Sequence, residues 1–210
     1  MQLDRPLAAI TPTVDGDVLL VLSRADAEFT PATVQQLCGR HSVDGVRKTL
    51  NRLTEQGIVT SRSAGRARLY SLNRQHLLAP SIVAIADVAR EFTRRIETHV
   101  GDWSVEPVLV AVFGSAAFGQ MRPDSDIDLL VVRQDHVDPD DATWRAQIID
   151  FELAVTAWTG NDARVLEFSL AEVRQRPDER VLKDALTHGI AVVGEFSALT
   201  EPAARTGTSR

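Results

Sequence analysis

Two aliphatic runs joined through a glycine-containing loop constrain this 210-residue chain more than any other feature. Residues 108–113 and 126–132, VLVAVF and DIDLLVV, have the aliphatic character of strands that are covered on both faces. The first run ends at Gly114-Ser115, and Gly119 follows in the loop. Glycine permits a close backbone approach, and a helix that begins here directs free N–H groups at an anion. The pattern therefore predicts two buried strands with an anion-binding turn after the first.

The second run begins with two acids. Residues i and i+2 of a strand point to the same face, so Asp126 and Asp128 would lie roughly 7 Å apart at Cα. Two carboxylates this close repel each other unless a cation lies between them, and Mg²⁺ favours carboxylate and phosphate oxygens. The combination predicts a site for a nucleoside triphosphate and Mg²⁺. The alternative is structural: Asp126 would be a turn acid and Asp128 a buried, hydrogen-bonded carboxylate.

Residues 114–132 resemble the Gly-Ser … Asp-x-Asp signature of the polymerase-β-like nucleotidyltransferase superfamily, particularly its minimal bacterial branch. The resemblance implies a small mixed sheet with helices against it and Mg²⁺-dependent transfer of a nucleotidyl group from a nucleoside triphosphate. By that resemblance Asp126 and Asp128 hold two metal ions, which activate an acceptor hydroxyl and neutralise the leaving pyrophosphate. It gives the nucleotide-binding residues as Gly114, Ser115, Gly119, Arg122 and Ser125. Phe118 departs from the family pattern, in which a basic residue commonly precedes the second glycine.

The superfamily also expects a third carboxylate on a neighbouring strand. Residues 163–169 alternate as a strand does, which places Glu167 with Val165 and Ser169 on one face. An acid inside an otherwise apolar strand is unusual, so Glu167 is the predicted third catalytic and metal-binding acid. A surface acid on an edge strand is the alternative. Asp150 and Glu152 would compete for this role only if the helix predicted over residues 141–158 were a strand.

Charge is distributed unevenly along a chain whose net charge is −6. Residues 1–75 hold ten Lys and Arg against seven Asp and Glu, whereas the remainder holds thirteen against twenty-two. Within residues 36–74, eight basic residues are accompanied only by Asp44 and Glu55. A basic segment in an acidic protein is typical of a nucleic-acid-binding surface, and a solvated helix face is the alternative.

The basic segment has the pattern of a helix-turn-helix followed by a hairpin. Thr30 or Thr33 can cap a short helix over residues 34–38, and Ser42 can open a second helix that ends at Gly57. One apolar stripe on the second helix is predicted to face the core, and it comprises Val43, Val46, Leu50 and Leu53. Two short strands, at residues 58–61 and 67–72, are predicted to turn around Ala64-Gly65.

Residues 29–73 resemble the winged helix-turn-helix of bacterial transcriptional regulators. A helix fits the major groove of DNA, and a basic hairpin beside it binds phosphates. Acids on the exposed helix face would repel phosphates, and a winged domain used for protein contact is the alternative. The predicted DNA-binding residues are Ser42, Arg47, Lys48, Asn51, Arg52, Arg62, Arg66 and Arg68.

The fold class predicted is α/β (α+β), with two parts. Residues 1–75 form the winged domain, 76–101 a linker helix, 102–196 the nucleotidyltransferase-like domain and 197–210 a flexible tail. The linker helix is predicted to pack on the core or, alternatively, on a second copy in a homodimer. A lone cysteine, the absence of a secretory signal and the absence of long apolar runs favour a cytoplasmic protein that does not contact a membrane.

Three functions follow as hypotheses. The first is a transcriptional regulator that binds double-stranded DNA and responds to a nucleotide. The second is an enzyme that transfers a nucleotidyl group to an unknown acceptor, which could be a protein, an RNA or a small molecule. The third is a catalytically inactive nucleotide-binding or antitoxin-like interaction module with a DNA-binding head.

Overall fold

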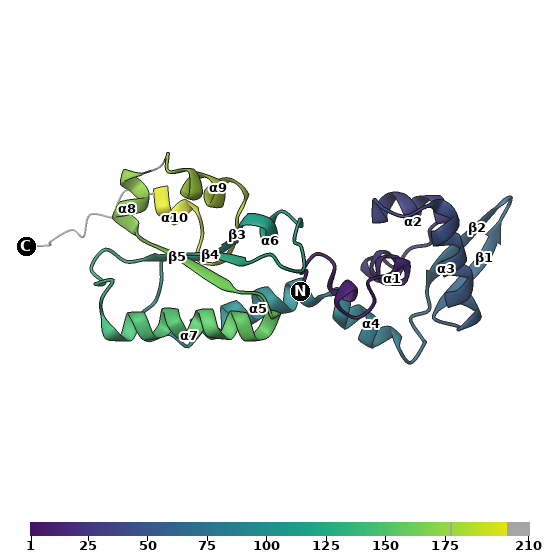
Figure 1. Cartoon of the computed structure of the whole chain (residues 1–210), viewed down its shortest axis with the longest axis horizontal. Coiled ribbons are helices and arrows are strands. Elements are labelled where there is room, and N and C mark those ends of the chain that lie inside the picture. Colours follow the sequence, from purple (N-terminus) through teal and green to yellow (C-terminus); the bar gives the residue numbers. More distant parts are fainter. Residues whose placement is uncertain (177, 201–210) are drawn as a thin grey trace, which may run out of the picture. The chain divides into compact units, whose positions relative to one another are not determined.

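The computed structural model describes residues 1–176 and 178–200, and the chain is α+β, as predicted. It divides into two compact units, residues 2–91 and residues 92–210 together with Met1 (Figure 1). The first unit contains four helices, a 3₁₀ turn and a hairpin. In chain order they are η1 (Pro6–Ala9), α1 (Val14–Arg24), α2 (Pro31–Cys38), α3 (Val43–Glu55), β1 (Val59–Ala64), β2 (Ala67–Leu72) and α4 (Ala79–Ala86).

Local capping fixes the ends of α2 and α3 as the sequence predicts. The Thr30 hydroxyl accepts the backbone N–H of Thr33 at 3.2 Å and begins α2. Gly39, with φ of 66°, ends α2 in the left-handed conformation that only glycine adopts freely. The Ser42 hydroxyl accepts the N–H of Gly45 at 3.1 Å and begins α3. The hairpin pairs β1 and β2 from Val59 opposite Leu72 to Ala64 opposite Ala67.

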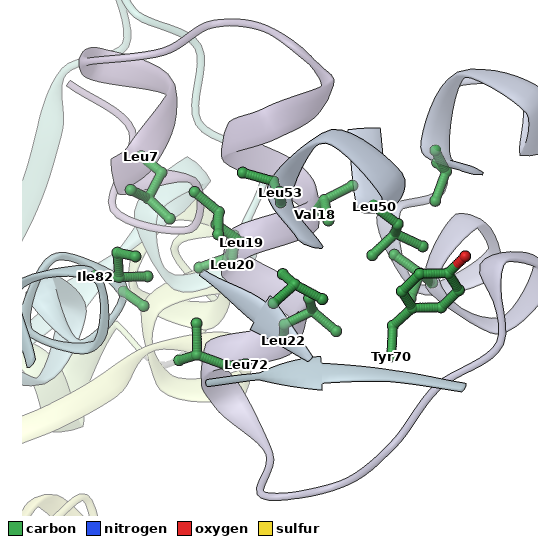
Figure 2. Packing of buried hydrophobic residues seen from close by; sticks show 14 of the residues in the cluster. Leu7, Val18, Leu19, Leu20, Leu22, Leu50, Leu53, Tyr70, Leu72 and Ile82 are labelled. Atoms are coloured by element: carbon green, nitrogen blue, oxygen red, sulfur yellow. The ribbon is translucent and has the colours of Figure 1, made fainter. Parts of the chain in front are cut away.

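The core of the first unit forms around α1 (Figure 2). Three of the four predicted stripe residues on α3, Val46, Leu50 and Leu53, are buried in it. Val43 is 45% exposed, because it is the first residue of α3 and only the later turns of that helix reach the core. Thr49 takes the remaining place on the buried side of α3.

The single linker helix predicted within residues 76–101 is two helices, α4 and α5 (Val88–Gly101), separated at Asp87. The buried residues of α4, Ala79, Ile82 and Ala86, belong to the core of the first unit. Phe92, Ile96 and Val100 of α5 are buried in the second unit. Because of the break, α4 packs in the core of the first unit and α5 packs in the second unit.

The second unit is built on a four-stranded mixed sheet in the order β5-β4-β3-β6. Strand β4 runs antiparallel to β3 and parallel to β5, and β6 runs antiparallel to β3. The elements that follow α5 are β3 (Leu109–Phe113), α6 (Gly114–Ala117), β4 (Ile127–Arg133), α7 (Ala142–Thr159), β5 (Ala163–Ser169), α8 (Leu170–Gln175), α9 (Arg180–His188), β6 (Ile190–Val193) and α10 (Ser197–Thr200).

Helices cover both faces of this sheet, which explains why β3 and β4 are aliphatic almost throughout (Figure 1). We call the face that carries Leu130 and Val132 the α9 face, because these side chains cluster with Leu182 and Ala185 of α9. The opposite face carries α7 and is called the α7 face. Within this unit α7 lies on one side of the sheet, and α8, α9 and α10 lie on the other.

The first four residues of the expected flexible tail, 197–200, form α10. Leu199 is 2% exposed and belongs to the α9-face cluster, so its burial orders this turn. Residues 201–210 of the expected tail lie outside the described residues. Among the described helices, none has both the length and the apolar character needed to cross a membrane.

Glu167 ties β4, β5 and α7 together on the α7 face. Its Oε1 atom accepts Arg133 Nε–H at 2.8 Å and Trp144 Nε1–H at 2.9 Å. Arg133 is only 9% exposed and also donates to the carbonyl oxygen of Val137 at 2.9 Å. Glu167 is therefore the closer of two acids that pair with this nearly buried arginine, the other being Glu172, whose Oε2 atom lies 3.6 Å from Arg133 Nη2.

We expect Glu167→Gln to lower the free energy of unfolding of the second unit by about 1–2 kcal/mol, because buried Arg133 would lose its closer carboxylate and keep only Glu172, 3.6 Å away. All three tryptophans, Trp103, Trp144 and Trp158, lie in this unit, so urea denaturation followed by tryptophan fluorescence reports on it alone. Glu97→Gln, which removes an exposed acid from α5 of the same unit, is the control. Equal stability of the two variants would contradict a structural role for Glu167.

Candidate functional site

The turn from β3 into α6 brings the backbone against the carboxylate of Asp128. Phe113, the last residue of β3, pairs with Asp128 of β4, so the next residue, Gly114, lies beside that side chain. Gly114 has φ of +64°, and a Cβ atom at this position would lie 2.4 Å from Asp128 Oδ2. The position thus requires glycine for its conformation and for its lack of a side chain. Gly114 and Ser115 are where the sequence predicted them, next to one of the two acids.

Asp126 directly precedes β4 and forms an ion pair with Arg164, whose Nη1 atom lies 2.8 Å from Asp126 Oδ2. Arg164 stands opposite Asp128 in the parallel register of β4 and β5. Two carboxylates and one guanidinium therefore meet at this end of the sheet. The sequence analysis did not single out Arg164, because its position beside the acids depends on the pairing of β4 with β5.

The pKa of the Asp128 carboxyl is raised above its ordinary value, first by burial and then by the negative charge of Asp126. Asp184 of α9 acts in the same direction, and the positive charge of Arg164 opposes it. The two acids therefore repel each other, as the sequence predicts. A site with this imbalance favours either a proton or a further cation at Asp128.

A buried amide holds the loop that leads into the acid pair. Asn161 is 4% exposed, and its Nδ2 donates to the carbonyl oxygens of Ser125 at 2.6 Å and Pro123 at 3.4 Å. Ser125 itself accepts the backbone N–H of Arg122 at 2.9 Å through its hydroxyl. Asn161 fixes the approach of the chain to Asp126. No sequence signal singles out Asn161, because its contacts with Ser125 and Pro123 join segments 36 and 38 residues apart.

The remaining predicted nucleotide-binding residues lie along the same loop. Gly119 adopts φ of 63° after α6, which allows the chain to turn away from the helix. Arg122 is exposed, and Ser125 is half-buried next to Asp126. The hydroxyl of Ser125 already serves the turn, so its part in a nucleotide site would be to shape the loop.

Glu167 does not join the acid pair. On β5, the residues on the α9 face with Asp128 are Arg164, Leu166 and Phe168, whereas Glu167 points to the α7 face. Its carboxylate is bound to Arg133 and Trp144, as described above. The prediction of Glu167 as third metal ligand is therefore wrong, because alternation along one strand does not reveal which face the strand presents to the acids.

The third carboxylate near the pair comes from α9. Asp184 lines a cavity of about 490 Å³ with Phe113 and other residues of α9, namely Arg180, Val181, Lys183, Thr187 and His188. The ring of Phe118, which departs from the family pattern, lies 4.8 Å from that of His188. Phe113 both lines the cavity and pairs with Asp128, so the cavity adjoins the acid pair.

The donor set of this site limits the metal it can hold. In the part of the chain that the structure describes, no three His, Cys, Asp or Glu side chains are grouped as ligands of one metal ion. Asp126 and Asp128 present oxygen ligands of the kind Mg²⁺ prefers, and their mutual repulsion is what a divalent cation would relieve. These residues fit one ion, and the second ion implied by the resemblance has no third carboxylate on β5 to hold it.

The predicted DNA-binding residues of α3 are engaged within the first unit. Asp44 pairs with Arg47 and, at 2.9 Å, with Lys48, and both cations lower the pKa of its carboxyl, Lys48 the more strongly. Arg52 pairs with Asp15. Asn51 accepts the hydroxyl of Tyr70 at 2.8 Å, which directs it toward the hairpin. Ser42 caps α3.

The hairpin carries the other predicted DNA contacts. Arg62 forms a two-point ion pair with Glu28, which lowers the pKa of that carboxyl. Arg68 donates to the Ser61 hydroxyl at 3.1 Å and lies 5.9 Å above the ring of Tyr70. Arg66 is exposed beside Gly65 in the turn between the strands. Basic side chains therefore share the surface of α3 and the hairpin with acids that neutralise several of them.

No curated protein matches the chain. Two solved toxin–antitoxin structures, one with AMP-PNP and one of a mutant of the MntA–HpeT pair, are 20% and 19% identical over 51% of this chain, each at a TM-score of 0.37. They are covered over 77% and 76% of their own lengths. TrmBL2, an archaeal chromatin protein described with a novel mode of DNA binding, is 15% identical over 80% of this chain and 69% of its own, at a TM-score of 0.27.

A family model matches the part of the chain that contains the acid pair. Residues 93–182, which include Gly114, Ser115, Asp126 and Asp128, match the family model of the nucleotidyltransferase domain.

Proposed function

We propose that the second unit binds a nucleoside triphosphate with Mg²⁺ and transfers its nucleotidyl group to an acceptor hydroxyl. The observation that carries this proposal is the contact of the Gly114 backbone with Asp128, beside Asp126, inside the segment that matches the nucleotidyltransferase domain. In the transfer, the hydroxyl oxygen bonds to the α-phosphorus, pyrophosphate leaves and the hydroxyl proton passes to solvent. Asp126 and Asp128 would hold the ion, which supplies positive charge to the phosphates.

We further propose that the first unit binds double-stranded DNA, so that the protein acts as a transcriptional regulator linked to this nucleotide site. The support is the basic excess of residues 36–74 and its placement on α3 and the hairpin. Exposed helices of this kind enter the major groove, and basic hairpins contact phosphates.

A second candidate function is nucleotide binding without transfer. The ion pair between Arg164 and Asp126 favours binding without transfer, because one of the two expected metal-binding carboxylates is already paired with a guanidinium. In that case the second unit would sense a nucleotide or contact a protein partner, as an antitoxin-like module does. The first candidate predicts a labelled product and the second predicts nucleotide binding without one, so one experiment separates them.

Transfer is tested by incubating the protein and a cell lysate with each α-³²P-labelled nucleoside triphosphate and Mg²⁺. We expect label in a protein, an RNA or a small molecule, and we expect Asp126→Asn and Asp128→Asn to abolish it. Asp140→Asn, which removes an exposed acid ahead of α7, should leave it unchanged. Calorimetric binding of AMP-PNP without any labelled product would favour the second candidate, and absence of both would refute a nucleotide function.

The charge of Asp128 should make the free protein less stable. Because its pKa is raised in the folded state, folding binds the proton more tightly than the unfolded chain does, and this stabilisation is lost as pH rises through the folded pKa. At pH 7 without divalent cations, we expect Asp128→Asn to raise Tm by about 2 °C. The difference should shrink as pH falls through the folded pKa, because wild-type Asp128 then takes up a proton and loses its charge.

The same melts, followed by tryptophan fluorescence, test whether Asp128 holds a cation. Addition of MgCl₂ should raise the Tm of the wild type and leave that of Asp128→Asn unchanged, since only the wild type has the carboxylate at position 128 that would bind the ion. An equal response of the two proteins to MgCl₂ would contradict this placement of Mg²⁺.

DNA binding is tested by fluorescence anisotropy with a labelled duplex from upstream of the protein's own gene. We expect Arg47→Ala with Lys48→Ala to weaken binding and to reduce the slope of log K against log salt by about 2. Asp44→Asn should strengthen binding, because it releases both cations from an internal ion pair. Asp26→Asn removes an exposed acid from the same unit, outside α3, and is the control. If Asp44→Asn and Asp26→Asn behaved alike, α3 would not be the DNA-contacting helix.

A further inference from the structure

The acid pair has an unequal environment that the nucleotidyltransferase resemblance does not predict. Asp126 is paired at 2.8 Å with Arg164, whereas Asp128 is half-buried against the Gly114 backbone with two other acids acting on it. A site for two divalent cations needs enough carboxylate oxygens to bind both. Here one of the two acids is already bound to a positive charge that belongs to the chain.

Arg164 lies at the position on β5 where a third metal-binding carboxylate would be expected. Arg164 is the residue of β5 directly opposite Asp128, on the α9 face, and the next two residues of β5 on that face are Leu166 and Phe168. A third carboxylate on the neighbouring strand would have to occupy one of these positions. The chain places a cation at the closest of them.

We infer that Arg164 takes the place of one of the two metal ions, so that the site of Asp126 and Asp128 binds at most one divalent cation. This inference rests on the proposed nucleotide site and concerns how that site is charged. Asp126, Asp128 and the guanidinium carry a net charge of −1, or −2 when nearby Asp184 of α9 is included, and one Mg²⁺ is enough to neutralise either. The guanidinium has five N–H donors, so an arginine bound to Asp126 keeps donors for a phosphate oxygen of the nucleotide.

Mn²⁺ is the probe, and the free ion is measured by its electron paramagnetic resonance signal during titration of the full chain. We expect the wild type to bind no more than one Mn²⁺. Arg164→Gln should bind Mn²⁺ about fivefold more tightly, because it frees Asp126 from an exposed ion pair. Arg164→Glu supplies the missing carboxylate and should bind a second ion.

Two controls assign the effect to the acid pair. Arg145→Glu makes the same change in net charge from an exposed position on α7 and should leave both the number and the affinity of bound ions unchanged. Asp126→Asn combined with Arg164→Gln should remove the gain, since the freed ligand is then absent. Circular dichroism verifies that each variant is folded.

Two bound Mn²⁺ ions in the wild type, or equal affinity in the wild type and Arg164→Gln, would overturn the inference. A wild type that binds no measurable Mn²⁺ supports it if Arg164→Gln gains a site and overturns it otherwise. Calorimetry with Mg²⁺ and AMP-PNP on the same proteins is a separate readout. If the protein binds AMP-PNP but Arg164→Gln does not change Mn²⁺ binding, the proposed function stands and the inference fails. If Arg164→Gln strengthens Mn²⁺ binding but no nucleotide binds, the charge arrangement is supported and the proposed function fails.

Discussion

Two carboxylates at one end of a strand need a positive charge between them, and the candidate site of the second unit is arranged around that requirement. The loop held by Asn161 positions Asp126 at the start of β4, and glycine at position 114 allows the backbone to lie against the Asp128 carboxylate. Arg164, on the next strand, neutralises Asp126 only. Burial and the remaining negative charge raise the pKa of Asp128, and a bound cation would relieve the repulsion between the two acids.

Features set by neighbours in the sequence could be predicted, and those set by packing could not. Strand β5 has the predicted bounds, Ala163–Ser169, because its alternation and flanking turn are local signals. The caps of α2 and α3 at Thr30 and Ser42 are local in the same sense. The predicted role of Glu167 as a metal ligand was wrong because the sequence does not show which face of the sheet a residue of β5 lies on. That face is set by the register of β5 with β4 and by the helix that covers it. Arg164 and Asp184 reach the acid pair only through such long-range pairing, so no sequence signal pointed to them.

Charge counting had a similar limit in the first unit. The basic excess of residues 36–74 is real, but the acids that neutralise it include Asp15 and Glu28, which lie outside that segment. Asp44 alone holds Arg47 and Lys48 on one face of α3. DNA would have to compete with these internal pairs for the same cations. If this surface binds DNA, as proposed, it would bind phosphate less strongly than its count of arginines indicates, and single acids would control its affinity.

The Arg133–Glu167 and Arg164–Asp126 pairs of the second unit both join neighbouring elements, and they differ in how far they are exposed to solvent. The side chains of Arg133 and Glu167 are 11% and 20% exposed, so breaking that pair leaves a charge in a poorly hydrated place. The side chain of Arg164 is 68% exposed, and exposed ion pairs contribute at most about 1 kcal/mol. The first pair is therefore part of the framework of the sheet. In the proposed nucleotide site the second pair would exchange partners, because a phosphate would offer Arg164, and a divalent cation would offer Asp126, an interaction at least as strong as this exposed ion pair.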